Sequence, residues 1–288
     1  MRKVFNQTNK IALALMIIAI SVDGYSRRVM NSNKGGGTGN GPTPAAGCAA
    51  AVDIATLELN NVRTRVEGTG GSMWQDRANS IADYEVPKRG SNDDPKFTSI
   101  YAGALWMGGQ DINGQLKLAA VTFRASGNDF WPGPLDKTTA EVNANECALF
   151  DRNWGISRAQ VDQFVAWYET GLVDPNQQQE DFPGYTIPKV ILEWPAKGNT
   201  VTNGAFSYTI KEDLAPFFDR DGDDFYDPYA GDYPKYDLVG DIDCRTTRDV
   251  RLFGDTTIWF VFNDKGNTHS ETQGPAIGTV SYTHLTLP

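Results

Sequence analysis

The sequence predicts a mainly β fold, β-sandwich-like or at most α+β, with one amphipathic helix near residues 157–170. Short apolar segments separated by turn-forming residues favour strands over helices. The 288 residues include 29 glycines and 15 prolines, which suit the turns between short strands. Hydrophobic residues make up 40% and aromatic residues 11% of the chain, which is enough to fill a core. We therefore expect a globular, strand-rich domain.

The N-terminal segment has the features of a signal peptide. Three basic residues precede an uninterrupted apolar run at residues 11–20. Such a run is too short to span a bilayer but suits the central region of a secretory signal. Because small residues follow at alternate positions, we expect residues 1–24 to be removed by cleavage after Ser21 or Gly24. The alternative is a buried N-terminal helix.

The net charge restricts the class of partner. The formal charge is -10, and removal of residues 1–24 takes away three basic groups and one acidic group, which leaves -12. Such a surface repels nucleic acids and anionic membranes. No second apolar stretch is long enough for a transmembrane helix. We expect a secreted or cell-surface protein with no transmembrane span in the mature chain, no nucleic-acid partner, and an extracellular glycan or protein partner of unknown identity.

A flexible linker is expected between the signal peptide and the folded domain. Gly, Pro and Ala dominate much of residues 25–52, and no hydrophobic periodicity interrupts them. Folding is expected to begin at Asp53, and the β-rich domain is expected to occupy residues 53–279.

The three cysteines are an odd number for a chain that meets an oxidising compartment. Cys48 falls in the expected linker, whereas Cys147 and Cys244 fall in the expected domain. We therefore expect a disulfide between Cys147 and Cys244. Two buried free thiols are the alternative, because a sequence does not give the Cα separation that a disulfide requires.

Alternation and turn residues predict the strands. One strand is expected over residues 54–68, and two more over 99–127 on either side of a turn that contains Asn113 and Gly114. Later strands are expected at 186–195, 204–210 and 256–269.

Helical spacing predicts one helix. Ser157 is a suitable N-cap, and Gly171 is expected to close the segment. Residues 176–180 are expected to form a polar loop. The apolar stripe, at i, i+3, i+4 and i+7, is expected to pack into the core and consists of Val161, Phe164, Val165 and Tyr168.

The C-terminal residues 280–288, "VSYTHLTLP", resemble one translated reading frame of a transposase-end sequencing adapter. On this interpretation the β-rich domain is truncated at its C-terminal end. The alternative is an ordinary β-strand, because Val, Tyr and Thr suit one.

An acidic loop at residues 217–234 is the strongest candidate for a functional site. It contains six aspartates, and like charges a few Å apart repel unless a cation or solvent compensates them. Oxygen donors at alternating positions suit Ca²⁺ better than Mg²⁺, which requires a tighter octahedron. A solvated acidic loop is the alternative. The predicted calcium ligands are the carboxylates of Asp219, Asp221, Asp223, Asp227 and Asp232 and the main-chain carbonyl of Phe225.

This loop resembles the aspartate-rich calcium loops of the thrombospondin type 3 and EF-hand kind. It departs from the EF-hand at two positions. Asp224 stands where an EF-hand has glycine, and Ala230 stands where it has the bidentate glutamate. A helix-loop-helix arrangement is therefore not expected.

A second candidate site is the aromatic loop at residues 127–135. Phe130 and Trp131 lie among prolines and glycines, and rigid exposed aromatic rings can stack on sugars. The alternative is that both rings fold back into the core. An enzymatic function is disfavoured because no acid–base pair or nucleophile stands out. His269 is expected on the surface of a hairpin, and His284 lies in the segment that resembles an adapter.

Several long stretches together resemble a known group of proteins. They are "NNVRTRVEGTGGSMW", "YEVPKRG", "IYAGALWMGGQDINGQLKLAAVTFRASGNDFWPGPL", "APFFDRDGDDFYDPYAGDYP" and "WFVFNDKGNTH". Most of residues 55–278 is similar to the N-terminal region of large secreted surface proteins of gliding bacteria, which carry a type IX secretion sorting domain. The resemblance implies export to the cell surface and carries no known activity. We expect a non-enzymatic, adhesin-like or structural surface protein. A secreted carbohydrate-binding or glycan-hydrolysing module is the alternative.

Overall fold

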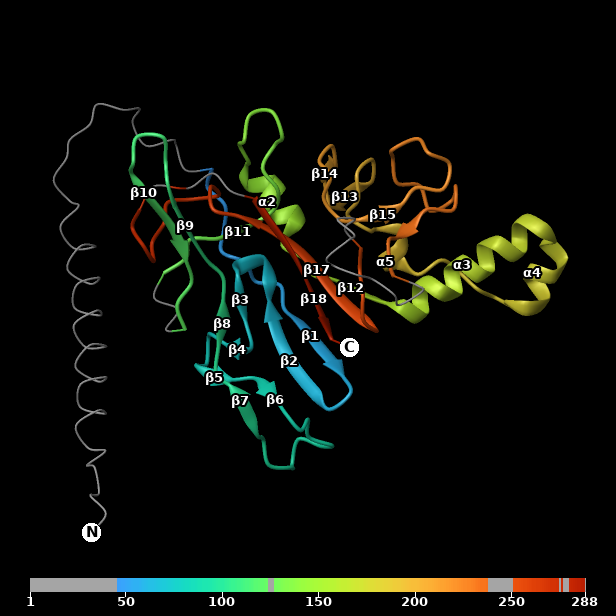
Figure 1. Cartoon of the computed structure of the whole chain (residues 1–288), viewed down its shortest axis with the longest axis horizontal. Helices are drawn as coiled ribbons and strands as arrows, with labels where there is room; N and C mark the ends of the chain where they lie inside the picture. Colours follow the sequence, from blue (N-terminus) through green and yellow to red (C-terminus); the bar gives the residue numbers. More distant parts are fainter. Residues whose placement is uncertain (1–45, 124–126, 238–250, 275, 277–279, 288) are drawn as a thin grey trace, which may run out of the picture. The chain divides into compact units, whose positions relative to one another are not determined.

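The computed structural model describes residues 46–123, 127–237, 251–274, 276 and 280–287 (Figure 1). Strands account for 29% and helices for 17% of the residues, and the strands form several small sheets without a barrel. The predicted strand-rich fold class is therefore confirmed. The predicted signal peptide at residues 1–24 and the thiol of Cys244 lie outside the described residues.

The first sheet is built by residues that follow the predicted linker. The sequence predicted one strand over residues 54–68, but Asn60, with a φ of 53°, turns the chain and makes a hairpin of β1 and β2. The sheet has the order β7-β6-β2-β3-β8, with β1 added on β2. Its strands are β1 (Ala55–Leu59), β2 (Val62–Glu67), β3 (Ser72–Met73), β6 (Tyr84–Glu85), β7 (Thr98–Ile100) and β8 (Gly103–Ala104). A small ribbon of β4 (Gln75–Asp76) and β5 (Ile81–Ala82) lies between β3 and β6 in the sequence.

The predicted hairpin around Asn113 and Gly114 is confirmed. β9 (Trp106–Gln110) and β10 (Leu116–Ala120) pair in antiparallel register. Gly114 has a φ of 75°, a conformation that favours glycine, and Asp111 Oδ1 accepts hydrogen bonds from the N–H groups of Asn113 and Gln115.

β17 (Thr256–Asn263) is the most buried strand of the described chain. It pairs with β11 (Trp131–Pro132), β12 (Trp154–Ser157) and β18 (Val280–Leu287). Both of its faces are covered, because Trp259 belongs to one apolar cluster and Phe260 to another. Within the segment 256–269, the predicted strand is thus confirmed over Thr256–Asn263 as a core strand. The segment that resembles an adapter forms β18.

The predicted amphipathic helix is confirmed as α3 (Arg158–Val173). Ser157 caps it, and Val161 and Phe164 are fully buried. The helix runs past Gly171, the expected end, because Asp174 caps its C-terminus. Asp174 is also the N-cap of α4 (Pro175–Asp181), so the expected polar loop at 176–180 is helical.

The structure differs from the sequence prediction at two further helical segments, α5 and α2. The strand expected over residues 186–195 is wrong: that segment contains α5 (Lys189–Leu192), a single turn that follows Pro188. An apolar run of this length does not distinguish a strand from a buried helical turn. The sequence analysis also missed α2 (Ala144–Phe150), whose capping box involves Asn143 and Glu146. The strand expected at 204–210 is confirmed as β14 (Phe206–Thr209), which pairs with β13 (Thr200–Asn203).

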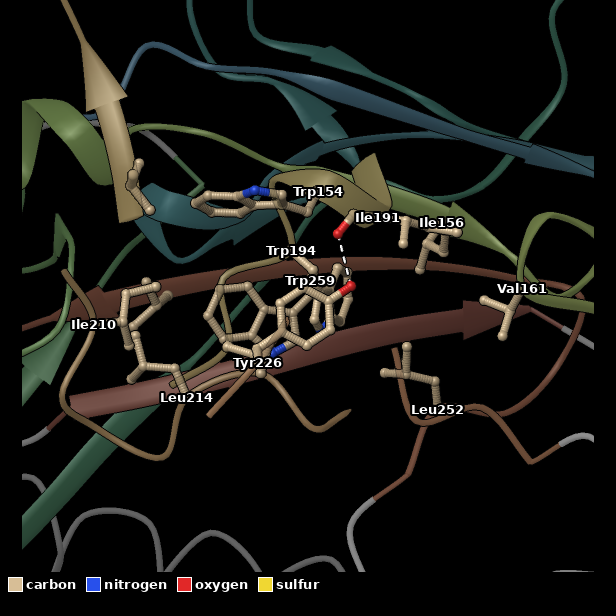
Figure 2. Packing of buried hydrophobic residues seen from close by; sticks show 14 of the residues in the cluster. Trp154, Ile156, Val161, Ile191, Trp194, Ile210, Leu214, Tyr226, Leu252 and Trp259 are labelled. Carbon is tan, nitrogen blue, oxygen red and sulfur yellow. Dashed lines mark hydrogen bonds between the residues drawn. The ribbon is translucent and has the colours of Figure 1, made fainter. Parts of the chain in front are cut away.

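The larger apolar cluster lies around three tryptophans from different elements. Trp154, Trp194 and Trp259 are at most 1% exposed, and the ring centroid of Trp259 lies 5.5 Å from that of Trp154 and 6.2 Å from that of Trp194 (Figure 2). Tyr226 enters this cluster from the acidic loop, and its hydroxyl donates to the carbonyl of Ile191 at 2.7 Å. The acidic loop is therefore anchored directly in the core.

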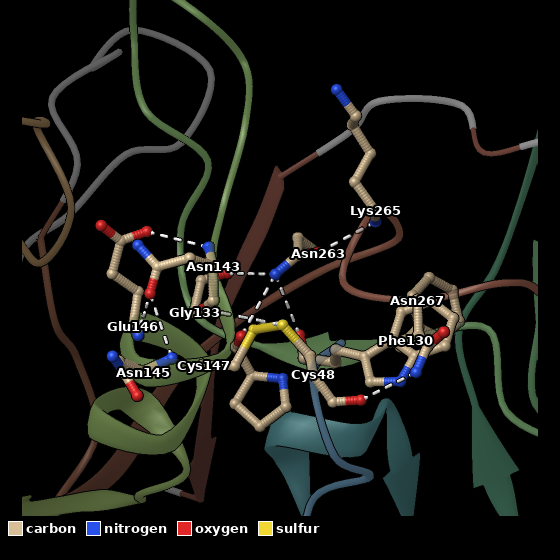
Figure 3. Close-up of a disulfide and its surroundings, with 12 residues drawn as sticks. Cys48, Phe130, Gly133, Asn143, Asn145, Glu146, Cys147, Asn263, Lys265 and Asn267 are labelled. Carbon is tan, nitrogen blue, oxygen red and sulfur yellow. Dashed lines mark hydrogen bonds between the residues drawn. A yellow bond between two sulfur atoms is a disulfide. The ribbon is translucent and has the colours of Figure 1, made fainter. Parts of the chain in front are cut away.

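The disulfide joins Cys48 and Cys147, so the predicted pairing of Cys147 with Cys244 is wrong (Figure 3). The Cα atoms of Cys48 and Cys147 lie 5.8 Å apart. The main chain of Cys48 is held by Gly266, whose carbonyl accepts from its N–H, and by Asn267, whose side chain donates to its carbonyl. Cys48 is only 2% exposed, so the end of the range predicted as a linker belongs to the folded domain.

Candidate metal centre

A short β ladder closes the base of the acidic loop. β15 (Phe217–Phe218) pairs with β16 (Tyr233–Pro234). The rings of Phe218 and Tyr233 stack with their centroids 4.9 Å apart and an interplanar angle of 14°. The loop therefore lies between two strands and not between two helices, in agreement with the expected departure from an EF-hand.

The structure brings three of the predicted ligands together. One carboxylate oxygen from each of Asp219, Asp221 and Asp223 lies within 4.8 Å of the others. Asp219 is half-buried, whereas Asp221 and Asp223 are exposed. Because alternate residues of this turning segment direct their carboxylates toward one place, the group can hold a metal ion.

Main-chain N–H groups fix the orientation of Asp219 within the group. Its Oδ1 accepts from the N–H of Gly222 at 2.8 Å and its Oδ2 from the N–H of Asp224 at 2.9 Å. These hydrogen bonds, that of Asp224 first, lower the pKa of the Asp219 carboxyl. Gly222 and Asp224 both have positive φ, at 78° and 68°, which lets the chain wrap closely around this carboxylate. Asp219 is thus held ionised and oriented before any ion binds.

The fourth aspartate of the run, Asp224, is not a member of the three-carboxylate group. Asp224 forms an ion pair with Lys197, whose ammonium also lies 5.5 Å from the ring centroid of Phe225. The hydrogen bond from Lys197 to Asp224 is the main reason that the pKa of Lys197 is raised. The negative charge of Asp224 is therefore compensated within the protein, whereas Asp221 and Asp223 have no ion pair among the described residues.

Asp232 and Asp227 are part of the framework of the loop and not of the three-carboxylate group. The buried Asp232 accepts from the N–H of Arg220 through Oδ1 and from the N–H of Asp227 through Oδ2, both at 2.9 Å. Burial raises the pKa of Asp232, and the negative charges of Asp219 and Asp221 add to that effect. Asp227 Oδ1 in turn accepts from the N–H of Tyr229 at 2.8 Å.

Phe225 takes part through its main chain. Its N–H donates to Asp223 Oδ1 at 2.8 Å, and its ring is 53% exposed. The structure therefore separates the five predicted carboxylate ligands into the three grouped ones and the two of the framework, Asp227 and Asp232. The carbonyl of Phe225 as a calcium ligand stays a prediction. A sequence does not reveal this division, because every aspartate in the run has the same chemistry.

Two contacts that the sequence analysis missed attach the loop to helix α3. The hydroxyl of Tyr168 donates to the carbonyl of Ala230 at 2.7 Å. The guanidinium of Arg220 lies 5.2 Å from the ring centroid of Tyr168 and 3.2 Å from a carboxylate oxygen of Glu169. Gly231 allows this approach, because a Cβ at its position would lie 2.5 Å from the Tyr168 ring. Tyr168 was predicted only as part of the apolar stripe.

The structure does not support the ligand-binding role predicted for Phe130 and Trp131. Their side chains are 0% and 3% exposed. Phe130 packs against Phe262 with ring centroids 5.1 Å apart, and Trp131 lies beside His269. Burial of a large aromatic ring is favourable because it removes apolar surface from water. Phe130 is received by an apolar face of β17, whereas Trp131 packs in a separate apolar cluster with Cys48 and Cys147.

The expected surface position of His269 is also wrong. The residue is 3% exposed, and its ring nitrogens contact the carbonyl oxygens of Leu118 at 3.1 Å and of Asp264 at 2.8 Å. The imidazole thus connects the loop after β17 to the β9–β10 hairpin. The side chain of His284 lies outside the described structure.

Comparison of the chain with protein-family models, with curated proteins and with solved structures finds no match. Within the described residues, no helix has the length and apolar character needed to cross a membrane.

Proposed function

We propose that the chain is a non-enzymatic, exported cell-surface or extracellular protein, adhesin-like or structural in role, with a loop that Ca²⁺ stabilises. The observation that carries the metal assignment is the three-carboxylate group of Asp219, Asp221 and Asp223, whose oxygens lie within 4.8 Å of one another. These carboxylates repel one another at the surface unless an ion or water compensates them.

Calcium suits this group better than the other common ions. All donors in the group are hard carboxylate oxygens, and no histidine or free cysteine is among them. Ca²⁺ accepts six to eight oxygens in an adaptable geometry, so water molecules can complete a shell that three carboxylates begin. Mg²⁺ requires a stricter octahedron, to which an exposed turning loop is poorly suited.

The disulfide supports the proposed export. Cys48 and Cys147, which are 99 residues apart in the sequence, form a buried disulfide. Disulfides of this structural kind persist mainly in extracellular and periplasmic proteins. The basic and apolar segment at residues 1–20 supports the same location.

The metal assignment is tested by calorimetric titration of the chelator-treated protein with CaCl₂, together with thermal melts with and without chelator. Saturable binding and a lower melting temperature in chelator are expected. Asp221→Asn is expected to abolish both effects, because it removes one of the three grouped charges. Asp93→Asn is the matched control, since Asp93 is exposed and lies outside the loop. Identical melts of the unaltered protein in calcium and in chelator would show that the loop needs no ion.

The alternative of a carbohydrate-binding or glycan-hydrolysing module no longer has Phe130 and Trp131 as its binding platform, because both side chains are buried.

The export assignment is tested separately, by expressing the full chain in a Gram-negative bacterium, fractionating the cells and sequencing the N-terminus of the protein. Protein outside the cytoplasm without residues 1–24 is expected. Uncleaved protein in the cytoplasm would contradict the proposed location while leaving the calcium result unaffected.

A further inference from the structure

A pocket of about 370 Å³ lies beside helices α3 and α4. Its volume falls within the range typical of small-ligand sites. None of its lining side chains carries a charge, although the chain has a formal charge of -10. The lining consists of Trp167, Gln178, Gln179, Phe182, Pro183, Gly184 and Tyr185. A neutral ligand is therefore favoured over an ionic one.

Aromatic rings form much of the pocket lining. The ring centroids of Trp167 and Tyr185 lie 5.2 Å apart with an interplanar angle of 38°, and the ring of Phe182 lies 6.3 Å from that of Tyr185. All three side chains are half-buried, so each ring is packed on the protein and also reaches the surface. Rigid aromatic faces of this kind suit the apolar C–H face of a pyranose ring.

Several polar groups in the lining have no protein partner among the described residues. The indole N–H of Trp167 and the carboxamide of Gln179 make no hydrogen bond there. Gln178 uses Nε2 to donate to the carbonyl of Trp167 at 2.8 Å, which leaves its Oε1 available. The hydroxyl of Tyr185 is buried without a partner, which is costly unless water or a ligand supplies one. The pocket therefore presents both donors and acceptors, all of them uncharged.

The pocket is also preformed by the helix connection. A Cβ at Gly171 would lie 2.3 Å from Gln178 Nε2, so the glycine is what allows α4 to pack this closely on α3. Gly184 has a φ of 72°, which turns the chain between Pro183 and Tyr185. Because the lining is ordered before binding, a ligand loses less free energy in ordering it.

We propose that this pocket binds a neutral saccharide, by stacking of a pyranose ring on the aromatic lining and by hydrogen bonds to Gln178, Gln179 and Tyr185. The hydroxyl of Tyr185 is buried, so this last hydrogen bond forms when the ring shifts to expose the hydroxyl. A proline-rich peptide is the competing class of ligand for an aromatic-lined pocket. Proline offers carbonyl acceptors but no N–H, so it would leave the amide oxygens of Gln178 and Gln179 without donors. Sugar hydroxyls both donate and accept. The site is separate from the three-carboxylate group and does not depend on a metal.

The test uses the whole chain on an array of neutral oligosaccharides, followed by calorimetric titration with the glycans that bind. Tyr185→Phe and Gln179→Ala are each expected to weaken binding about fivefold to tenfold, as loss of one neutral hydrogen bond does. Tyr229→Phe is the matched control, because this tyrosine is 74% exposed and lies on the acidic loop. The glycan affinity of the Tyr229→Phe variant is expected to equal that of the unaltered protein.

The variant Tyr185→Phe separates a ligand-binding role from a purely structural one. Removal of an unpartnered buried hydroxyl is expected to leave the melting temperature unchanged or raised, so a weaker affinity in this variant reports the binding site and not unfolding. The proposal is overturned if no neutral glycan binds, if both substitutions leave glycan affinity unchanged, or if a proline-rich peptide binds in place of sugars.

Discussion

The acidic loop at residues 217–234 and the aromatic loop at 127–135 were both predicted from sequence as candidate sites. The structure exposes the key side chains of the first and buries those of the second. Asp221 and Asp223 stay at the surface, whereas Phe130 and Trp131 are buried. The difference follows from the cost of removing each group from water. Burial of an uncompensated carboxylate is strongly unfavourable, whereas burial of an aromatic ring is among the largest favourable contributions to folding. The surface exposure of a candidate site is therefore predicted more safely from sequence when the site consists of charged residues than when it consists of aromatic rings.

The largest expected effect comes from truncating the buried loop. Phe130→Ala is expected to lower the free energy of unfolding by about 3–5 kcal/mol, because it leaves a cavity against Phe262. The exposed counterpart is Phe225→Ala in the acidic loop, which is expected to cost less than about 1 kcal/mol in metal-free buffer. Urea unfolding of both variants measures the difference. Equal costs would mean that the two loops do not differ in the way the structure describes.

The next effect concerns the disulfide beside the aromatic loop. Cys48→Ala is expected to lower the free energy of unfolding by about 2–5 kcal/mol, because it releases the constraint between Cys48 and Cys147. The same substitution at Cys244 breaks no disulfide within the chain, because Cys147 is already paired with Cys48. Denaturant melts, with mass mapping of a non-reduced digest, distinguish the two pairings. A large loss at Cys244 with none at Cys48 would restore the pairing that the sequence suggested.

A smaller effect is expected from ions at the acidic loop. Calcium at a hundredfold excess over its Kd is expected to raise the free energy of unfolding by about 2.7 kcal/mol. Magnesium at the same concentration is expected to raise it less, because the exposed carboxylates do not impose an octahedron. Urea melts in each ion give the comparison, and the Phe130→Ala variant should retain the full calcium increment because its cavity lies outside the loop. Equal stabilisation by both ions would contradict the assignment to calcium.

The fold was predictable where local chemistry and tertiary contacts agree. The hairpin at Asn113 and Gly114 and the helix after Ser157 depend on turn and cap residues within a few positions of each other, and both were predicted. The turn at Asn60 and the helix after Asp174 also have local causes, but weaker ones, because Asn and Asp serve equally well in loops. The strand predicted over residues 186–195 was wrong because a short apolar run fits both the strand period and the helical period.

The candidate site was predictable in composition but not in geometry. Spacing identified Asp219, Asp221 and Asp223 as one group, since alternate residues share a side of an extended or turning chain. The role of Asp232 was not predictable, because its carboxylate is occupied by two main-chain N–H groups that only folding brings together. The predicted disulfide pairing was wrong for the same reason. Cys48 lies close to Cys147 because the segment after β17 holds the main chain of Cys48 through hydrogen bonds.

The smallest effect concerns two carboxyls of the acidic loop whose pKa values shift in opposite directions. Hydrogen bonds from the main chain lower the pKa of Asp219 below its usual 3.8, so its contribution to stability is present above the pKa of the unfolded chain and is lost as the pH falls. Burial raises the pKa of Asp232 above 3.8, so its contribution is present below the pKa of the unfolded chain and is lost as the pH rises through the folded value.

Calcium bound in the acidic loop is expected to change the pKa of Asp232 and to leave the pKa values of carboxyls elsewhere in the protein unchanged. The charges of Asp219 and Asp221 help to raise the pKa of Asp232, and a bound cation would neutralise them. Carboxyl ¹³C titrations are therefore expected to show the pKa of Asp232 falling when calcium is added. Asp76 is the control, because its pKa is lowered mainly by a hydrogen bond from Asn79, in another part of the chain. A pKa of Asp232 that calcium leaves unmoved would place the ion away from this loop, because a divalent charge beside Asp219 and Asp221 necessarily weakens their field at Asp232.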